Sequence, residues 1–219
     1  MDNDNHIKKE MSKHCPDHWL TIAKKINSIA QSGLTFTKDD FDRERYTELL
    51  RLSISILNNI TEIDSKKLDF IFNRDIGYQT PKAGIRAVVF QDDKVLMVKE
   101  RMDNKWCLPG GYADVGMTPS EVAIKEVKEE SGFDVKPLRI LGLIDYNKHQ
   151  DRPFPFDIYQ IFMDCEIIGG EAAIGIETSD VGFFNIDNLP ELSVRRVTKS
   201  QILQMHELHN NKELEPIFD

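Results

Sequence analysis

The chain has 219 residues, of which 40% are hydrophobic and 30% are charged, and its formal net charge is -9 at pH 7. This length and composition are typical of a soluble globular protein with one sizeable domain, or with a modest domain and a small accessory one. The apolar runs are shorter than the roughly 18 residues of a membrane span, and the acidic balance disfavours loose binding to nucleic acid because no basic stripe can release counterions.

The first fifteen residues, MDNDNHIKKEMSKHC, contain no apolar stretch and no small-residue cleavage site. This pattern argues against a secretion signal and predicts a disordered start, residues 1–15. Three cysteines, Cys15, Cys107 and Cys165, lie far apart and form no CxxC pair. We therefore expect a reduced, cytoplasmic setting and neither metal binding nor nucleophilic catalysis by these thiols.

Apolar residues at helical spacing predict two helices within an N-terminal domain, residues 16–76. The first helix covers residues 16–32, with Gly33 as its stop, and the second begins after an N-cap at Thr37 and ends near Ile60. A hairpin of two helices cannot bury both apolar stripes by itself, so it should pack on the rest of the chain or on a second copy. The long stripes favour a homodimer, and packing within the chain is the alternative.

From residue 77 onward the pattern changes to short apolar runs that predict strands. These runs occupy residues 85–90, 94–100, 138–146 and 156–168. The first two are joined by a predicted hairpin turn at residues 91–93. A last helix is predicted over residues 198–208, which completes a second domain, residues 77–219.

The segment GGYADVGMTPSEVAIKEVKEESGF, residues 110–133, contains the helix with the clearest end signals. Thr118 and Glu121 have the spacing of a capping box, and a proline stands at the first helical position. At the other end Gly132 suits the left-handed C′ position. The sequence therefore predicts a helix over residues 119–131.

Glu126, Glu129 and Glu130 project from one face of that helix, because they are three and four positions apart. A solvated charged face is the common explanation of such a run. In a partly enclosed site, however, two carboxylates about 5 Å apart repel by roughly 3 kcal/mol at an effective dielectric of about 20. A cation would then be required, and oxygen ligands suit Mg²⁺ or Mn²⁺, which also bind substrate phosphates.

The same segment resembles the Nudix box, in which Gly, five residues, Glu and seven residues precede Arg-Glu-apolar-x-Glu-Glu-x-Gly-apolar. Here the pattern runs from Gly111 to Phe133 with its spacing complete. Met117 replaces the first glutamate and Lys125 replaces the arginine, two residues that often pair in the family and help to orient the helix. The three glutamates that bind metal in the family are retained as Glu126, Glu129 and Glu130. Lys125 is expected to pair with Asp114 instead.

The resemblance implies an α+β fold in which a Nudix α/β/α sandwich with a mixed sheet follows a small helical hairpin domain. It also implies that the box glutamates are ligands of Mg²⁺ or Mn²⁺, with the carbonyl of Gly110 as a further ligand and Glu129 as a catalytic candidate. The metal ligands expected from the resemblance are Gly110, Glu126, Glu129 and Glu130.

Several residues outside the box are further candidates, each with a simpler alternative. Glu177 is expected to be an extra ligand or general base, or else a solvated loop residue. Arg86 and Arg101 flank predicted strands and could bind phosphate, or form salt bridges. Trp106 and Tyr112 could stack on a base, or pack beside the Gly-Gly turn.

Upstream motifs, GLTFTKDDFDRERY and GYQTPK, add a resemblance to the Nudix subgroup with an N-terminal domain. Its members hydrolyse nucleoside diphosphates linked to another moiety, as in CDP-choline and ADP-ribose pyrophosphatases. The resemblance therefore implies a small nucleoside diphosphate substrate and release of a nucleoside monophosphate. Two alternatives are a non-catalytic ligand-binding module, which would commonly have lost the glutamates, and an RNA-end phosphohydrolase or exonuclease, which the net charge disfavours.

Overall fold

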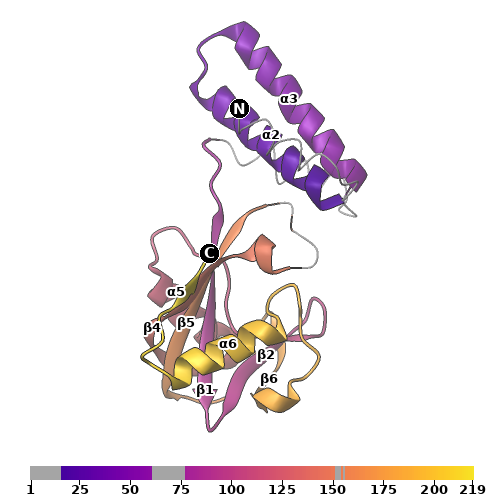
Figure 1. The fold of residues 1–219 in the computed structure, drawn as a ribbon. Coiled ribbons are helices and arrows are strands. Elements are labelled where there is room, and N and C mark those ends of the chain that lie inside the picture. The colour runs from indigo at the N-terminus through magenta and orange to yellow at the C-terminus, as the bar shows by residue number, and fades with distance from the viewer. Residues whose placement is uncertain (1–15, 61–76, 151–153, 155) are drawn as a thin grey trace. The chain divides into compact units, whose positions relative to one another are not determined.

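The computed structural model in Figure 1 describes residues 16–60, 77–150, 154 and 156–219. The chain divides into two compact units, and residues 82–150 and 158–219 form the second. The expected disordered start, and the end of the expected N-terminal domain, lie outside the described residues. Within the described ranges, no helix is both long enough and apolar enough to cross a bilayer.

The N-terminal unit contains two antiparallel helices, α2 (Pro16–Phe36) and α3 (Asp40–Ile60). Gly33 does not stop α2, as the sequence predicted, because the helix continues to Phe36. A Cβ atom at Gly33 would lie 2.4 Å from the Cε1 atom of the Tyr46 ring. The glycine therefore allows close packing of α2 against α3, and its role is tertiary rather than terminating.

The predicted N-cap of the second helix is also wrong by two residues. Asp39 Oδ1 accepts a hydrogen bond from the Asp42 amide at 2.9 Å, so Asp39 caps α3. The Thr37 hydroxyl accepts from the Asp39 amide at 3.1 Å and braces the turn before the helix.

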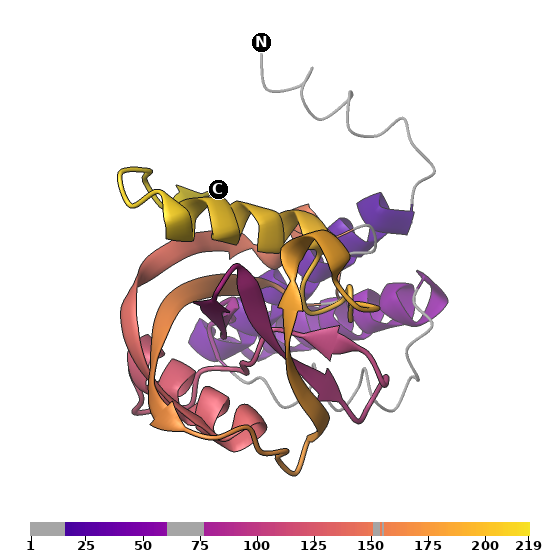
Figure 2. The same cartoon turned by 90° about the horizontal axis from the view of Figure 1, so that it is seen from below.

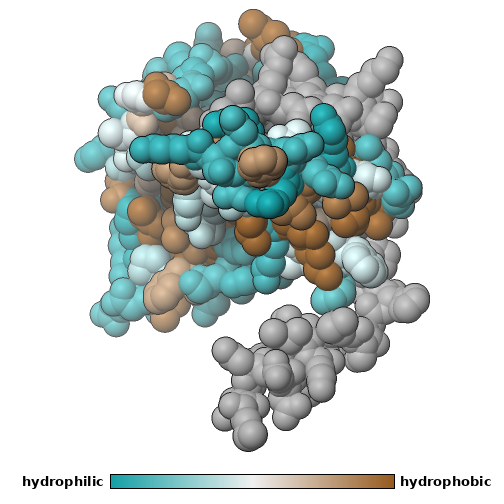
Figure 3. Space-filling model, turned by 90° about the horizontal axis from the view of Figure 1, so that it is seen from above, coloured by the Kyte–Doolittle hydropathy of each residue, from teal (hydrophilic) through white to brown (hydrophobic). Residues whose placement is uncertain are grey.

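The two helices do not bury all of their apolar residues against each other, as the sequence predicted. Trp19 and Ile29 are 48% and 61% exposed. Asn27 and Ser53, both fully buried, meet between the helices with a 3.1 Å hydrogen bond. Figure 3 shows apolar side chains among hydrophilic ones on the face seen from above. The small apolar core of the hairpin consists of Leu20, Ala23, Ile54 and Leu57.

The second unit is built on a seven-stranded sheet with the order β3-β2-β1-β5-β4-β7, in which β6 also pairs with β2. Two pairs, β1 with β5 and β4 with β7, are parallel, and the others are antiparallel, so the sheet is mixed as expected. The strands are β1 (Lys82–Gln91), β2 (Lys94–Glu100), β3 (Trp106–Cys107), β4 (Phe133–Asp145), β5 (Ile158–Gly170), β6 (Thr178–Asn185) and β7 (Ile217–Phe218).

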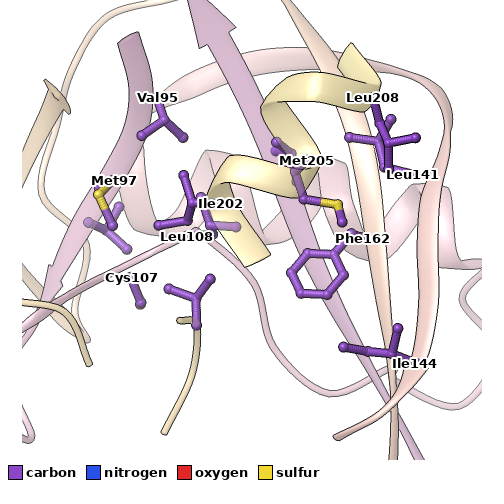
Figure 4. Packing of buried hydrophobic residues seen from close by; sticks show 13 residues of the cluster. Val95, Met97, Cys107, Leu108, Leu141, Ile144, Phe162, Ile202, Met205 and Leu208 are labelled. Carbon is purple, nitrogen blue, oxygen red and sulfur yellow. The ribbon is translucent and has the colours of Figure 1, made fainter. Parts of the chain in front are cut away.

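Helices cover both faces of this sheet, which gives the α/β/α layers (Figure 2). The helix α5 (Pro119–Ser131) packs on one face through Val122, Ala123 and Val127. The helix α6 (Lys199–Asn210) packs on the other face, where its apolar side chains meet Phe162 and Leu141 (Figure 4). Two short 3-10 helices, η1 (Tyr146–His149) and η2 (Ile186–Asn188), lie in connections.

The turn between β1 and β2 is tighter than predicted. Gln91 already pairs with Lys94, so only Asp92 and Asp93 form the loop. Their φ angles are 50° and 58°, the left-handed values required by a two-residue turn that matches the strand twist.

The helix α5 begins and ends where the sequence predicted. Thr118 accepts from the Glu121 amide, and the Glu121 carboxylate accepts from the Thr118 amide at 2.8 Å, which completes the capping box. Gly132 follows the helix with φ at 80°. These local contacts fix the start and the end of the segment that carries the three glutamates.

We expect Thr118→Ala to lower the free energy of unfolding by about 1 kcal/mol, because an amide of the first helical turn loses its hydroxyl acceptor. Urea denaturation followed by circular dichroism measures the change. Thr118→Ser is the matched control and should behave like the wild type. Equal stability of the alanine variant and the wild type would contradict the capping role.

Candidate active site

The turn at residues 108–113 lies beside β1 as an irregular extension of the sheet. The amide of Ala87 donates to the Pro109 carbonyl at 2.9 Å, and that of Ile85 donates to the Gly111 carbonyl at 2.8 Å. A Cβ atom at Gly110 would lie 2.1 Å from the Ile85 carbonyl oxygen, and its φ is 149°. Only glycine allows this approach, so Gly110 is required for the turn to lie against the strand.

The buried carboxylate of Glu130 joins α5 to this turn. Its Oε2 atom accepts a hydrogen bond from the Gly110 amide at 2.9 Å, and the residue is only 6% exposed. Burial raises the pKa of the Glu130 carboxyl to about 7, although the Gly110 hydrogen bond and the charge of Arg86 oppose the shift. The side chain is therefore held in place but poorly compensated in charge.

Glu126 and Glu129 extend the acidic surface outward along α5. The Glu126 carboxylate lies over Gly111, where an added Cβ would be 2.7 Å from its Oε1 atom. Burial raises the pKa of Glu126, and the negative charges of Glu129 and Glu177 add to the effect. The side chain of Glu129 is 60% exposed. Solvent exposure thus increases from Glu130, which is buried, through Glu126 to Glu129.

Lys125 borders the cluster and pairs with Asp114, as expected from the sequence. Its Nζ atom lies 2.8 Å from Asp114 Oδ2 and 3.8 Å from Glu129 Oε2. Met117 packs against the apolar cluster beneath α5. A lysine–aspartate pair and an apolar contact therefore stand where the box usually has its glutamate and arginine.

Arg86, a predicted phosphate-binding residue, lies at the site on β1. Its Nη1 atom donates to the Leu108 carbonyl at 3.3 Å and also to the Gly110 carbonyl. Its positive charge opposes the rise in pKa that burial causes at both Glu126 and Glu130. The Gly110 carbonyl thus already accepts a hydrogen bond from Arg86, and its role as a metal ligand stays a prediction.

Glu177 lies in the loop before β6, and its charge acts on Glu126. The amide of Arg101 donates to the Glu177 carbonyl at 2.9 Å, and Arg101 Nε donates to the Ile176 carbonyl at 3.0 Å. Arg101 therefore contacts the loop that carries Glu177. The structure thus brings Glu177 near the box. It also gives Arg101 a contact with the loop that the sequence did not suggest, and phosphate binding by Arg101 stays a prediction.

The two aromatic candidates have different surroundings. The Trp106 ring packs edge-on against Phe184, with 4.5 Å between ring centroids, next to the apolar core on the α6 side. The sequence had placed this alternative packing beside the Gly-Gly turn, and base stacking by Trp106 stays a prediction. Tyr112 is 51% exposed and forms an isolated bridge with Gly84 on β1, and its stacking on a base stays a prediction.

Glu100 is an acidic residue near the site that sequence reasoning missed. It is 5% exposed at the end of β2, and its Oε1 atom lies 3.0 Å from Arg196 Nε and accepts from Cys107 Sγ at 3.2 Å. Its charge contributes to the raised pKa of Glu130. A glutamate between a strand and a polar turn looks solvated in sequence, so no local signal distinguishes it.

The site is rich in oxygen donors of the kind that Mg²⁺ and Mn²⁺ bind. Among the described residues, no three His, Cys, Asp or Glu side chains form a ready-made metal cage. Mg²⁺ does not require one, because it usually keeps several waters and binds one or two carboxylates together with substrate phosphates. The buried, undercompensated carboxylates therefore fit a divalent cation.

Family models match both parts of the chain. Residues 17–72 match the family model described as the UDP-X-like N-terminal oligomerisation domain, and residues 80–204 match the NUDIX domain. A protein of Bacillus subtilis (strain 168), provisionally named ADP-ribose pyrophosphatase YjhB, is 41% identical over 201 residues, which are 92% of this chain and 97% of that protein.

Two solved structures are also similar. A UDP-X diphosphatase is 33% identical, with a TM-score of 0.61 and coverage of 93% of this chain and 99% of that chain. An ADP-ribose pyrophosphatase of Streptococcus suis 89-1591 is 38% identical, with a TM-score of 0.59 and coverage of 64% of this chain and 100% of that chain. The chain therefore belongs to the Nudix family, as a pyrophosphohydrolase whose catalytic domain follows an N-terminal domain of the UDP-X-like type.

Proposed function

We propose that this Nudix hydrolase cleaves the diphosphate of nucleoside diphosphates linked to another moiety, with ADP-ribose and CDP-choline as candidate substrates, in a reaction that depends on Mg²⁺ or Mn²⁺. The main observation is the surplus of negative charge at the Gly110 turn, where the buried Glu130 carboxylate accepts a hydrogen bond from the Gly110 amide. The names of the relatives, ADP-ribose pyrophosphatase and UDP-X diphosphatase, support this substrate class.

The divalent cation that Nudix hydrolases generally use would, when bound, offset the charge of the diphosphate and polarise its phosphorus–oxygen bonds. Glu126, Glu129 and Glu130 would hold this cation, with Glu130 fixed by the Gly110 amide. Because burial raises the pKa of Glu130, its carboxyl is partly protonated near neutral pH. Cation binding would therefore release a proton from this residue.

The other side chains of the site would act on the substrate or on the attacking water. Arg86 points its Nη1 atom at the Gly110 turn and would bind a phosphate oxygen beside it. Glu129 or Glu177 would accept the proton of a water that attacks one phosphorus, which yields a nucleoside monophosphate and a second phosphate ester. Tyr112, with its exposed ring, would stack on the base.

We further propose that the N-terminal hairpin forms a homodimer. The matching family model is described as an oligomerisation domain. Large apolar side chains are exposed on the two helices and would be covered by a second copy. They are Trp19, Ile29, Phe36, Phe41, Leu49 and Leu52.

The substrate proposal is tested by incubating the protein with ADP-ribose, CDP-choline and UDP-sugars in Mg²⁺ or Mn²⁺ and identifying the products. We expect a nucleoside monophosphate from at least one of them, and none after EDTA treatment. Glu130→Gln should lower kcat by about a hundredfold or more, because even outer-shell partners of a metal cost about 10- to 100-fold. Metal-independent turnover, or a fully active variant, would reject the proposal.

Glu130 should also make metal-free stability depend on pH. Its folded pKa of about 7 lies above the ordinary 4.5, so its contribution is present below about pH 4.5 and is lost as pH rises through about 7. The loss should reach about 3 kcal/mol. Urea unfolding in EDTA at about pH 5 and about pH 8 measures it.

Glu130→Gln is the control, because an amide cannot titrate. Its stability should change less between the two pH values than that of the wild type, and Mg²⁺ should stabilise only the wild type at the higher pH. The same pH dependence in both proteins would show that Glu130 is not the responsible group.

The dimer proposal predicts that Ile29→Glu shifts the protein toward monomers, because a charge would be buried in the interface. Sedimentation velocity at micromolar concentration measures the distribution. Asn58→Glu, at an exposed polar position of α3, is the control. A wild-type monomer at these concentrations would contradict the proposal.

A further inference from the structure

The loop between β5 and β6, together with Thr178 at the start of β6, is hydrogen-bonded to the last turn of α5. The amide of Ala173 donates to the Ser131 carbonyl at 2.9 Å. The Thr178 hydroxyl donates to the Glu130 carbonyl at 2.9 Å and accepts from the Gly175 amide at 2.7 Å. The loop thus binds carbonyls that the end of a helix leaves without intrahelical partners.

Thr178 makes this connection from a fully buried position. The hydroxyl donates one hydrogen bond to α5 and accepts one from the loop, so it links the two segments directly. Removing the hydroxyl would leave both the Glu130 carbonyl and the Gly175 amide without this partner, which is costly in a buried site. A valine would keep the shape and the β-branch of the side chain but not the link.

Gly175 allows the loop to approach α5 closely. A Cβ atom at this position would lie 2.0 Å from the Glu129 carbonyl oxygen, a separation that no side chain can adopt. The loop therefore passes directly over the backbone of two box glutamates, Glu129 and Glu130. This contact is independent of the Thr178 hydroxyl and points to the same arrangement.

Arg101, the residue that follows β2, contacts the other side of the loop. Its amide donates to the Glu177 carbonyl at 2.9 Å and its Nε atom donates to the Ile176 carbonyl at 3.0 Å. Both neighbours of Glu177 in the chain are therefore anchored. Ile176 is hydrogen-bonded to Arg101, and Thr178 is hydrogen-bonded to α5. The side chain of Glu177 is exposed, and its charge reaches Glu126.

We propose that Thr178 and Arg101 are positioning residues that set the carboxylate of Glu177 against the box glutamates. This inference rests on the proposed function, in which Glu177 acts on the substrate or its attacking water. Through the Thr178 hydroxyl, the backbone of α5 fixes the position of Glu177 as well as that of the box glutamates. Glu177 is then placed by the same helix turn that carries Glu129 and Glu130, although 47 positions separate Glu130 from it in the sequence.

The kinetic test compares Thr178→Val with Thr178→Ser in a Glu177 and in a Glu177→Gln background. We expect the valine to lower kcat about tenfold, the range of lost outer-shell contacts, with little change in KM. The serine should restore kcat. In the Glu177→Gln background the valine should change kcat by less than about twofold, because the residue it positions is already lost.

An equal loss of kcat in both backgrounds, or no loss at all, would overturn the inference. Arg101→Met is a second variant at an exposed position, for use if the valine variant folds poorly. Methionine has no N–H group to replace the Nε donor, and the backbone amide is kept, so this variant should lower kcat less than the valine does. Its effect should likewise vanish with Glu177→Gln.

Hydrogen exchange gives a readout that does not depend on turnover. In metal-free protein, amides of residues 173–178 should exchange about tenfold or more faster in Thr178→Val than in the wild type, and Thr178→Ser should stay protected. Unchanged exchange in the valine variant would overturn the loop-holding role. If the wild type hydrolyses none of the substrates, the proposed function fails and the exchange result decides the loop-holding role alone.

Discussion

The site depends on one constraint, the burial of the Glu130 carboxylate against the amide of Gly110. This hydrogen bond joins α5, which lies on one face of the sheet, to the turn that extends along β1. The turn can occupy this place because Gly110 has no Cβ atom to meet the strand. A single acid–amide contact thus aligns a helix, a turn and a strand that no local signal would bring together.

The cost of this arrangement is an unbalanced charge. Burial raises the pKa of Glu130 and of Glu126, and Glu100 adds a further buried carboxylate nearby. Arg86 and Lys125 reduce the imbalance, and both are positioned by other contacts, to the turn and to Asp114. A site of this kind fits a divalent cation, which would offset the negative charge of the glutamates and of an anionic diphosphate.

The departures from the box have a structural explanation. Lys125 forms its ion pair with Asp114, and Met117 packs beneath α5. The start of the helix is fixed by its own capping box rather than by a glutamate–arginine pair. The orientation of α5 therefore rests on backbone capping and apolar contacts, and Glu126, Glu129 and Glu130 stay on the face that meets the turn.

The sequence predicted best where one segment carries all of its signals. The helix α5, its caps and the spacing of its glutamates are local, and so is the pairing of β1 with β2. Prediction failed where a distant partner decides: Gly33 allows contact with Tyr46 and does not stop α2. The strand β6 was missed because TSDVGFFN begins with polar residues and lacks clear alternation.

The sequence by itself determined the box helix, the mixed helix and strand content and the identity of the candidate metal ligands. Tertiary structure alone decided that Glu130 is buried on Gly110, that Glu100 lies near it, and that Arg101 and Thr178 hold the loop of Glu177. The physical reason is that capping and periodicity act within a few residues. Burial and charge compensation, in contrast, depend on which distant segments meet.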